Sequence, residues 1–455
     1  MQDSRAAGPS QEDSIVVPSR SDPLLAAMVE PVGGPLGRRT EPGRSGPGFF
    51  TVDRVLVIMA AVSALLAVVA KNHCRVSGWT TPDQYSTVCW SQFPNSIPTG
   101  WPGSWFPFVS TGSTFDGSPV SGFVAGVAAW LTGFAGSGTA RTLAFFDANA
   151  LMVAAVWIFT VVVVARTAGR RPWDAAMVAA SPLLLLTAFV SWDFWAAALV
   201  GLGVLLFVRR NTLWAGLVLG VAAMAAPYAI LVLLAVLVLG IRTRQATAAL
   251  ETLAAGVVGW LLVLAPVMAL DGSAWRQYMG GFLSGTATES SIYGGWNLLA
   301  ARIGLPGLDG GAVNGLAAAL LVLVVLGVVA LGLYSPVRPS LVELSAVAVA
   351  GLLVVDKFAQ PWHAVWLLPL LALALPRWRP VLLWQAAVAV HFIALMLFQS
   401  KVLGNISDQH AIDTPYFVLA SALAGAASCA LAALLVRGLL QPRHGLPRRG
   451  GARHG

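Results

Sequence analysis

Apolar runs recur along this chain, and each run ends at a charge, a proline or a short polar segment. They lie near residues 55–70, 143–165, 175–190, 194–208, 213–225, 228–241, 252–270, 312–333, 341–355, 365–375, 381–398 and 416–436. A helix needs about 20 apolar residues to cross a bilayer, and shorter runs serve where a break inside the protein interrupts the helix. The pattern therefore predicts an all-α polytopic membrane protein with about twelve transmembrane helices.

Two runs depart from the simple pattern. Residues 213–241 are too long for one span and are broken at Pro227, which predicts a hairpin of two helices that enter and leave on the cytoplasmic side. Residues 120–134 are apolar but short, so we expect a helix at the outer membrane surface. That helix would belong to a large first outer loop over residues 72–142. No inverted repeat of the kind common in secondary transporters is visible.

The distribution of basic residues predicts how the chain is oriented in the membrane. It has 57% hydrophobic and only 11% charged residues, against roughly 25% charged in soluble domains. The net charge of +8 could suggest nucleic acid, but the basic residues stand at the ends of apolar runs. Lys and Arg accumulate on the cytoplasmic side of membrane proteins. With a cytoplasmic amino terminus, 21 of the 28 basic residues fall inside, which predicts that both termini are cytoplasmic.

The two ends of the chain differ from its middle. Residues 1–48 are rich in Pro, Gly, Ser and Arg without apolar periodicity, and we expect a disordered cytoplasmic tail. Residues 49–438 form the predicted transmembrane domain, and 439–455 a basic cytoplasmic tail.

The first outer loop holds the most varied polar chemistry of the chain. Cys74 and Cys89 form a disulfide if the loop faces an oxidising compartment, or otherwise remain two free structural cysteines. Asp83 stands in the segment TTPDQY, where it could form an Asx turn or act in catalysis. Loops on a rigid scaffold often carry function, and we expect selective chemistry in this loop, with a disulfide-pinned lid that carries no chemistry as the alternative.

Ionisable residues also stand at the outer ends of the apolar runs. Asp193 follows Trp192 between two runs, which favours a functional role, with local capping as the alternative. In the segment DKFAQPWHAVWLLP, Lys357, Gln360 and His363 occupy a break between two helices. A cation there could bind a phosphate, or the lysine could merely extend to the membrane surface.

Other motifs narrow the functional classes. Trp296, in SSIYGGWN, could belong to an interfacial aromatic belt or to a platform on which a sugar stacks. The sequence has no Walker phosphate loop, no GxGxxG after a strand, no HExxH and no CxxC pair, which argues against nucleotide-dependent chemistry in this chain. The six histidines are scattered, so we predict no metal site.

The order of three segments resembles a known family. After a first span and a large outer loop come SWDFWAAALVGLGVLLFVRR, WAGLVLGVAAMAAPYAILVLLA and DKFAQPWHAVWLLPLLALAL. This order is similar to that of glycosyltransferase family 87, the actinobacterial integral-membrane mannosyltransferases of the C-type glycosyltransferase superfamily. The resemblance runs over most of residues 55–436.

The resemblance implies a fold, a location and substrates. It implies a C-type glycosyltransferase-like bundle in the plasma membrane, with the active face outside. The donor would be a polyprenyl-phosphate sugar, typically polyprenyl-phosphate mannose, and the acceptor a glycolipid or polysaccharide of the cell envelope. Membrane lipids would be further partners, with no cofactor and no nucleic acid.

The resemblance also implies residue roles. Inverting transfer would use an acidic residue of the first loop as general base, but the matching run CWSQFPN has Gln92 where aspartate is expected. Asp83, or Asp116 farther along the loop, is then the predicted base. The family lysine near the lipid phosphate is missing from AAPY at 225–228. Lys357 and His363 are therefore predicted to bind the donor phosphate, and the predicted substrate lining is Trp90, Gln92, Asp193, Trp296 and Gln360.

Two alternatives stay open at this point. A catalytically silent relative could bind a lipid-linked sugar or support envelope assembly, which the glutamine and the missing lysine would favour. A lipid or sugar transporter would require paired charges in mid-membrane, whereas the ionisable residues here cluster at the ends of apolar runs.

Overall fold

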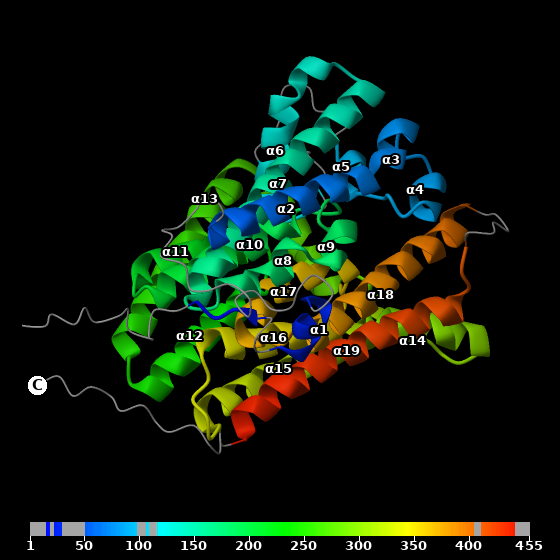
Figure 1. Cartoon of the computed structure of the whole chain (residues 1–455). Coiled ribbons are helices and arrows are strands. Elements are labelled where there is room, and N and C mark those ends of the chain that lie inside the picture. The colour runs from blue at the N-terminus through cyan, green and yellow to red at the C-terminus, as the bar shows by residue number, and fades with distance from the viewer. Residues whose placement is uncertain are drawn as a thin grey trace, which may run out of the picture.

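The structure is a computed structural model that describes residues 15–18, 22–29, 51–97, 106–108, 115, 117–404 and 411–441. Every regular element in these residues is helical, and they include no strand. The helices form one elongated bundle (Figure 1).

Six helices in the described part of the chain are long and apolar enough to cross a membrane. They are α2 (Val52–Ala70), α7 (Thr139–Ala168), α13 (Ala246–Ser284), α15 (Gly310–Tyr334), α18 (Trp378–Gly404) and α19 (Thr414–Leu440). The predicted class, an α-helical membrane protein, agrees with this architecture.

Shorter apolar helices lie between the long ones. They are η5 (Pro172–Ala175), α8 (Ala176–Ala179), α9 (Pro182–Thr187), α10 (Asp193–Val208), α11 (Thr212–Ala223), α12 (Ala229–Thr243), α16 (Leu341–Val355), η6 (Pro361–His363) and α17 (Ala364–Ala374). The twelve predicted runs all fall on helices, but only the six long ones meet the length for a full span. The number of twelve spans stays a prediction. The predicted break at Pro227 separates α11 from α12.

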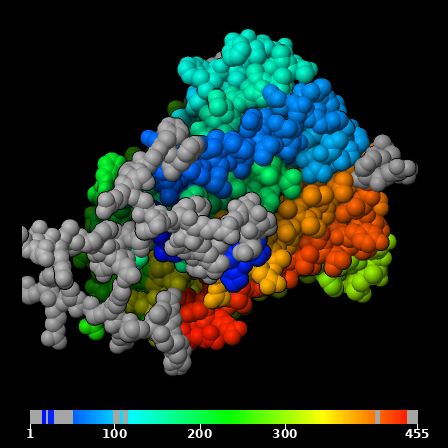
Figure 2. Space-filling view, in the orientation of Figure 1, coloured from blue at the N-terminus to red at the C-terminus, as the bar shows by residue number. Residues whose placement is uncertain are grey.

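Small helices cover one end of the bundle. They are α3 (Asn72–Ser77), α4 (Asp83–Ser86), α5 (Gln92–Asn95), α6 (Pro119–Leu131), η4 (Gly133–Ala135) and α14 (Ile292–Ile303). The expected helix at 120–134 is present as α6, and its Phe123 and Trp130 side chains are each 61% exposed. Figure 2 shows residues after α2 packed against α18, and α4 contacts α18.

Hydrogen bonds gather the arginine-bearing connections at the opposite end. Arg171, before η5, donates to Pro376 O in the α17–α18 turn at 3.4 Å. Arg242, at the end of α12, donates to Ser335 O in the α15–α16 turn at 2.6 Å. That turn reaches α19 through Val337 N, which donates to Leu439 O at 3.2 Å. The arrangement agrees with the predicted charge asymmetry, while the orientation in a membrane stays a prediction.

The tail expected to be disordered contains a short helix, α1 (Pro23–Val29). Asp22 caps it, since its Oδ1 accepts from Leu24 N at 3.0 Å. The other carboxylate oxygen accepts from Trp378 N at 3.0 Å, and Val16 N donates to Arg170 O at 2.8 Å. Two pieces of the tail therefore pack on the arginine-bearing end of the bundle.

The chain beyond the apolar run that ends near residue 270 remains largely helical. α13 continues to Ser284 across a single non-helical residue, Asp271 (φ −146°, ψ 71°). The Asp271 carboxylate accepts from Ala274 N at 3.2 Å, as an N-cap residue does at the start of a helix. A new helical segment thus begins at the Asp-Gly-Ser sequence of residues 271–273.

Glycines bring α11 and α13 into close contact. A Cβ at Gly216 would meet the backbone of Thr252, and one at Gly220 would meet the carbonyl of Gly256. Small residues allow helix backbones to approach closely inside membranes. This contact fixes α11 against the first half of α13, and with it the start of the turn at 224–228.

Candidate functional site

A cavity of about 860 Å³ opens where several helices are interrupted. Its size falls in the range of roughly 300–1,000 Å³ typical of small-molecule sites. The walls come from the start of α5, the α9–α10, α11–α12 and α16–η6 breaks, and the second half of α13. Residues that line it include Gln92, Ser191, Asp193, Pro227, Tyr278, Asp356, Gln360, Trp362, His363 and Trp366. The cavity is therefore polar and aromatic within an otherwise apolar bundle.

Asp193 enters the cavity at the first turn of α10. Its Oδ1 accepts a hydrogen bond from the indole Nε1 of Trp366 at 3.0 Å, and its Oδ2 accepts from the hydroxyl of Ser191. A carboxylate has about four lone-pair sites, so lone pairs remain for a ligand hydroxyl. Two donors hold the carboxylate in one orientation at the cavity wall.

The α9–α10 break is anchored on both sides. The buried Trp192 donates from Nε1 to Asn149 Oδ1 in α7 at 2.8 Å. Ser91 Oγ donates to Phe189 O at 2.7 Å, and Gln92 N donates to Val190 O at 2.8 Å. The segment predicted as the first outer loop is thereby joined to the break that carries Asp193, and Gln92 and Asp193 line the same cavity.

The α16–η6 break supplies a second carboxylate and an imidazole. Asp356 ends α16, and its Oδ1 accepts from Phe358 N at 3.0 Å. His363 stacks on Trp366 with a centroid distance of 4.2 Å and an interplanar angle of 10°. The His363 Nδ1 atom is buried and has no hydrogen-bond partner in the described structure. That nitrogen is available to a ligand in the cavity.

Trp366 links these groups. Its ring stacks with Tyr228 at 4.9 Å as well as with His363, while its N–H binds Asp193. Tyr228 is fully buried beside the α11–α12 turn. One indole therefore sets the relative positions of an imidazole and a carboxylate that are far apart in the sequence.

Lys357 occupies a different position from the one its predicted role needs. Its buried ammonium group donates to Leu283 O at 3.1 Å, to Gly285 O at 3.2 Å and to Asn314 Oδ1. An ammonium group has three donors, and all three are used. The lysine fastens the end of α13 to α15 and does not line the cavity.

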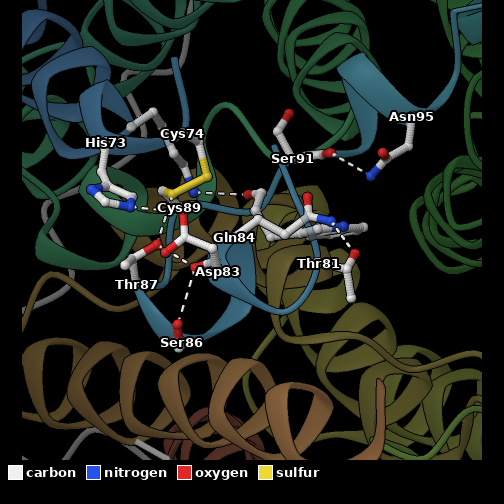
Figure 3. The surroundings of a disulfide bond; sticks show 12 residues. His73, Cys74, Thr81, Asp83, Gln84, Ser86, Thr87, Cys89, Ser91 and Asn95 are labelled. Carbon is white, nitrogen blue, oxygen red and sulfur yellow. Dashed lines mark hydrogen bonds and ion pairs between the residues drawn. A yellow bond between two sulfur atoms is a disulfide. The ribbon is translucent and has the colours of Figure 1, made fainter. Parts of the chain in front are cut away.

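Asp83 also lies outside the cavity lining. It begins α4, and its Oδ2 forms an ion pair with His73 Nε2 at 2.8 Å (Figure 3). The side chains are 54% exposed for His73 and 37% exposed for Asp83. Cys74 and Cys89 form the disulfide that the sequence left open. The disulfide closes residues 74–89 into a loop, called the disulfide-closed loop below, and Asp83 lies on its exposed side.

The other residues predicted for the site fall into four groups. Gln92, Asp193, Gln360 and His363 line the cavity. Trp90 lines a smaller neighbouring cavity, which Gln360 lines as well. Trp296, 43% exposed on α14, lines neither of these two cavities. Asp116 lies outside the described residues.

The sequence interpretation missed Tyr278 and Phe282, which line the cavity from the second half of α13. A signal for this helix was present, because Trp275, Tyr278, Met279 and Phe282 follow the i, i+3, i+4, i+7 spacing of one helix face. Tyr228 was also missed, since its position depends on stacking with the distant Trp366.

No protein-family model matches the chain, and comparison with curated proteins gives no match. The class of the protein therefore rests on its own architecture. It is an α-helical membrane protein with a polar, aromatic cavity at its interrupted helices.

Proposed function

We propose that the chain is an integral-membrane glycosyltransferase of the C-type kind, which moves a mannosyl or other sugar unit from a polyprenyl-phosphate sugar to a glycolipid or polysaccharide of the cell envelope. The observation that carries the proposal is the cavity of about 860 Å³, with Asp193 fixed in its wall and an unpartnered imidazole nitrogen near the same indole. A base and a hydrogen-bond donor for a phosphate are the groups that such a transfer needs.

The step can be written with Asp193 as general base. Its carboxylate takes the proton of an acceptor hydroxyl, and the hydroxyl oxygen forms a bond to the anomeric carbon of the donor sugar. The bond from that carbon to the phosphate oxygen breaks, and its electron pair leaves with polyprenyl phosphate. His363, whose Nδ1 has no partner within the described residues, would donate a hydrogen bond to the leaving phosphate.

The lipid portion of the donor has a suitable neighbour. The second half of α13 forms one wall of the cavity through Tyr278 and Phe282. The same part of the helix exposes Leu270 and Leu283, at 51% and 66%. A polyprenyl chain can lie against this apolar surface while its phosphate reaches the cavity.

This assignment replaces Asp83 by Asp193 as the preferred base. A general base must come within hydrogen-bond distance of the proton it removes. Asp193 lines the cavity, whereas Asp83 is paired with His73 at the surface. Lys357 is assigned a structural role because its donors are occupied.

A catalytically silent protein that binds a lipid-linked sugar is the second candidate. The observation that favours it is Gln92, which lines the cavity and cannot take up a proton. The two candidates differ in turnover, so an assay of transfer separates them.

The test measures transfer of radiolabelled sugar from polyprenyl-phosphate mannose, and from a panel of other polyprenyl-phosphate sugars, to lipid-extractable glycans. Membranes would contain the parent protein, Asp193→Asn, Asp356→Asn or the control Asp53→Asn, which changes an aspartate in the first turn of α2. Transfer by the parent and the control, with loss in Asp193→Asn, would support the proposal. Binding of donor without transfer by the parent would favour the silent protein.

A further inference from the structure

A second cavity of about 210 Å³ adjoins the first. It lies between the disulfide-closed loop, the segment before α14, the α16–η6 break and α18. Its polar and aromatic lining includes Tyr85, Trp90, Glu289, Gln360, Trp362 and Gln399. Gln360 and Trp362 line both cavities, so the two cavities share a wall.

Three aromatic rings form one side of this cavity. Tyr85 stacks on Trp90 at 6.2 Å with an interplanar angle of 18°, and Trp90 contacts Trp362 at 5.3 Å. Lys71 holds the backbone of Trp90 in place, because its buried Nζ donates a hydrogen bond to Trp90 O at 3.0 Å. Flat aromatic faces pack well against the C–H face of a sugar ring.

The polar groups of this cavity lack full pairing. Ser290 is buried and its Oγ has no partner, and Gln360 Oε1 is likewise buried without one in the described structure. A buried polar atom without a partner costs about 1–3 kcal/mol. The Ser290 hydroxyl can donate and accept a hydrogen bond, whereas Gln360 Oε1 can only accept one. Sugar hydroxyls can satisfy both.

Glu289 argues against a phosphate or a hydrocarbon chain as the ligand of this cavity. Its carboxylate, half-buried at the cavity, accepts from Gln399 Nε2. A carboxylate favours hydroxyl donors and repels phosphate. A hydrocarbon tail would leave the Glu289, Ser290 and Gln360 atoms unsatisfied.

We infer that this second cavity is a binding site for a neutral hexose unit of the acceptor glycan, and it directs an acceptor hydroxyl toward Asp193. The inference rests on the proposed function for the identity of the ligand as acceptor. The volume is below the roughly 300 Å³ at which drug-sized sites begin, which suits one sugar ring. The sugar would stack on Trp90 and donate to Glu289.

Binding can be measured without transfer. Purified full-length protein in lipid nanodiscs, free of sugar-based detergents, would be titrated by calorimetry with methyl and octyl glycosides of mannose, glucose and galactose. We expect at least one glycoside to bind, and Glu289→Gln or Ser290→Ala to weaken its binding by about tenfold. Glu251→Gln, a control for the loss of a carboxylate near the other end of the bundle, would leave binding unchanged.

The aromatic side of the second cavity is tested with a variant and a matched control. Trp90→Leu removes a ring from the cavity, and Trp214→Leu removes one that is 57% exposed on α11. We expect Trp90→Leu to weaken glycoside binding by about tenfold, and Trp214→Leu to leave it unchanged. Thermal unfolding of each variant checks that the fold persists.

The outcomes separate the two proposals. Glycoside binding that falls in the cavity variants while the parent transfers no sugar would support the site and count against the transferase. Transfer whose acceptor KM is the same in parent, Glu289→Gln and Ser290→Ala would overturn the site and leave the transferase standing. Failure of every glycoside in the panel to bind would also overturn the site.

Discussion

The disulfide-closed loop around Asp83 and the helix breaks around Asp193 present two aspartates in contrasting settings. Asp83 is 37% exposed and paired with a histidine that is itself exposed. Asp193 is held by an indole and a hydroxyl at the wall of a large cavity. Exposed ion pairs contribute little energy and remain accessible to water. Polar groups therefore gather at the cavity where helices are interrupted inside the bundle, whereas the exposed pair of Asp83 and His73 lies outside both cavities.

The largest expected effect tests which aspartate is the base. Asp193→Asn should lower sugar transfer by roughly 10²- to 10⁴-fold, because an amide cannot take the acceptor proton. Asp83→Asn should lower transfer by less than about fivefold, in keeping with a surface pair worth about 0.2–1 kcal/mol. The measurement is initial transfer rate in membranes with matched protein amounts. The reverse order of the two variants would return the base to the loop.

Removal of the disulfide should affect stability more than chemistry. The bond joins residues 15 positions apart, and closing a loop of about this length contributes about 3 kcal/mol. Cys74→Ser combined with Cys89→Ser should lower the thermal unfolding temperature while transfer at low temperature persists. Cys429→Ser, which changes an exposed free cysteine, is the control. Loss of transfer from a protein that remains folded would show that the loop takes a direct part in the reaction.

Loss of the indole donor should have an intermediate effect. Trp366→Phe keeps a ring but removes the N–H that binds Asp193. Hydrogen bonds to charged groups are worth about 1.5–3 kcal/mol, so transfer should fall by about tenfold or more. Initial transfer rates of Trp366→Phe and of the parent, measured in membranes with matched protein amounts, check this expectation.

A second indole provides the control for that change. Trp384 donates from Nε1 to the neutral hydroxyl of Ser428 at 3.0 Å. Trp384→Phe should reduce stability and leave the transfer rate of the folded protein unchanged. An equal fall of the transfer rate in both variants would argue against a specific role for the Trp366 contact.

The smallest effect concerns Lys71, which follows α2 and supports Trp90. Burial lowers the pKa of Lys71 to about 7 from its ordinary value of 10.5. Between pH 7 and 10.5 the unfolded chain binds a proton that the folded chain lacks, so this group makes stability rise with pH. Thermal unfolding of the parent and of Lys71→Met across this window should show a steeper rise for the parent. Parallel curves would contradict the assignment.

Local patterns predicted much of the fold. Apolar runs located the helices, Pro227 located the α11–α12 break, and the polar residues after Trp192 and Val355 located two more breaks. The continuation of α13 could not be foreseen from Asp271, Gly272 and Ser273, because an aspartate before glycine serves equally in a turn and at the start of a helix.

The site was less predictable than the fold. Aspartates at the ends of apolar runs look alike in sequence, and only long-range contacts distinguish them. Lys357 was expected at a phosphate, yet its partner Asn314 lies 43 residues away in the sequence. The position of His363 depends on an indole that also stacks on Tyr228, from another part of the chain. Such pairings arise from tertiary packing and leave no local pattern.

The contact between Trp366 and Asp193 also has a consequence for biosynthesis. The two residues are 173 positions apart, so the ribosome makes the aspartate long before its indole donor. The 16-residue helix α10 therefore enters the membrane with a carboxylate at its first turn whose final partner has not yet been synthesised. Such a helix is best retained close to the insertion machinery until α17 follows. A nascent chain that stops before residue 366 would hold the Asp193 carboxylate without its indole donor.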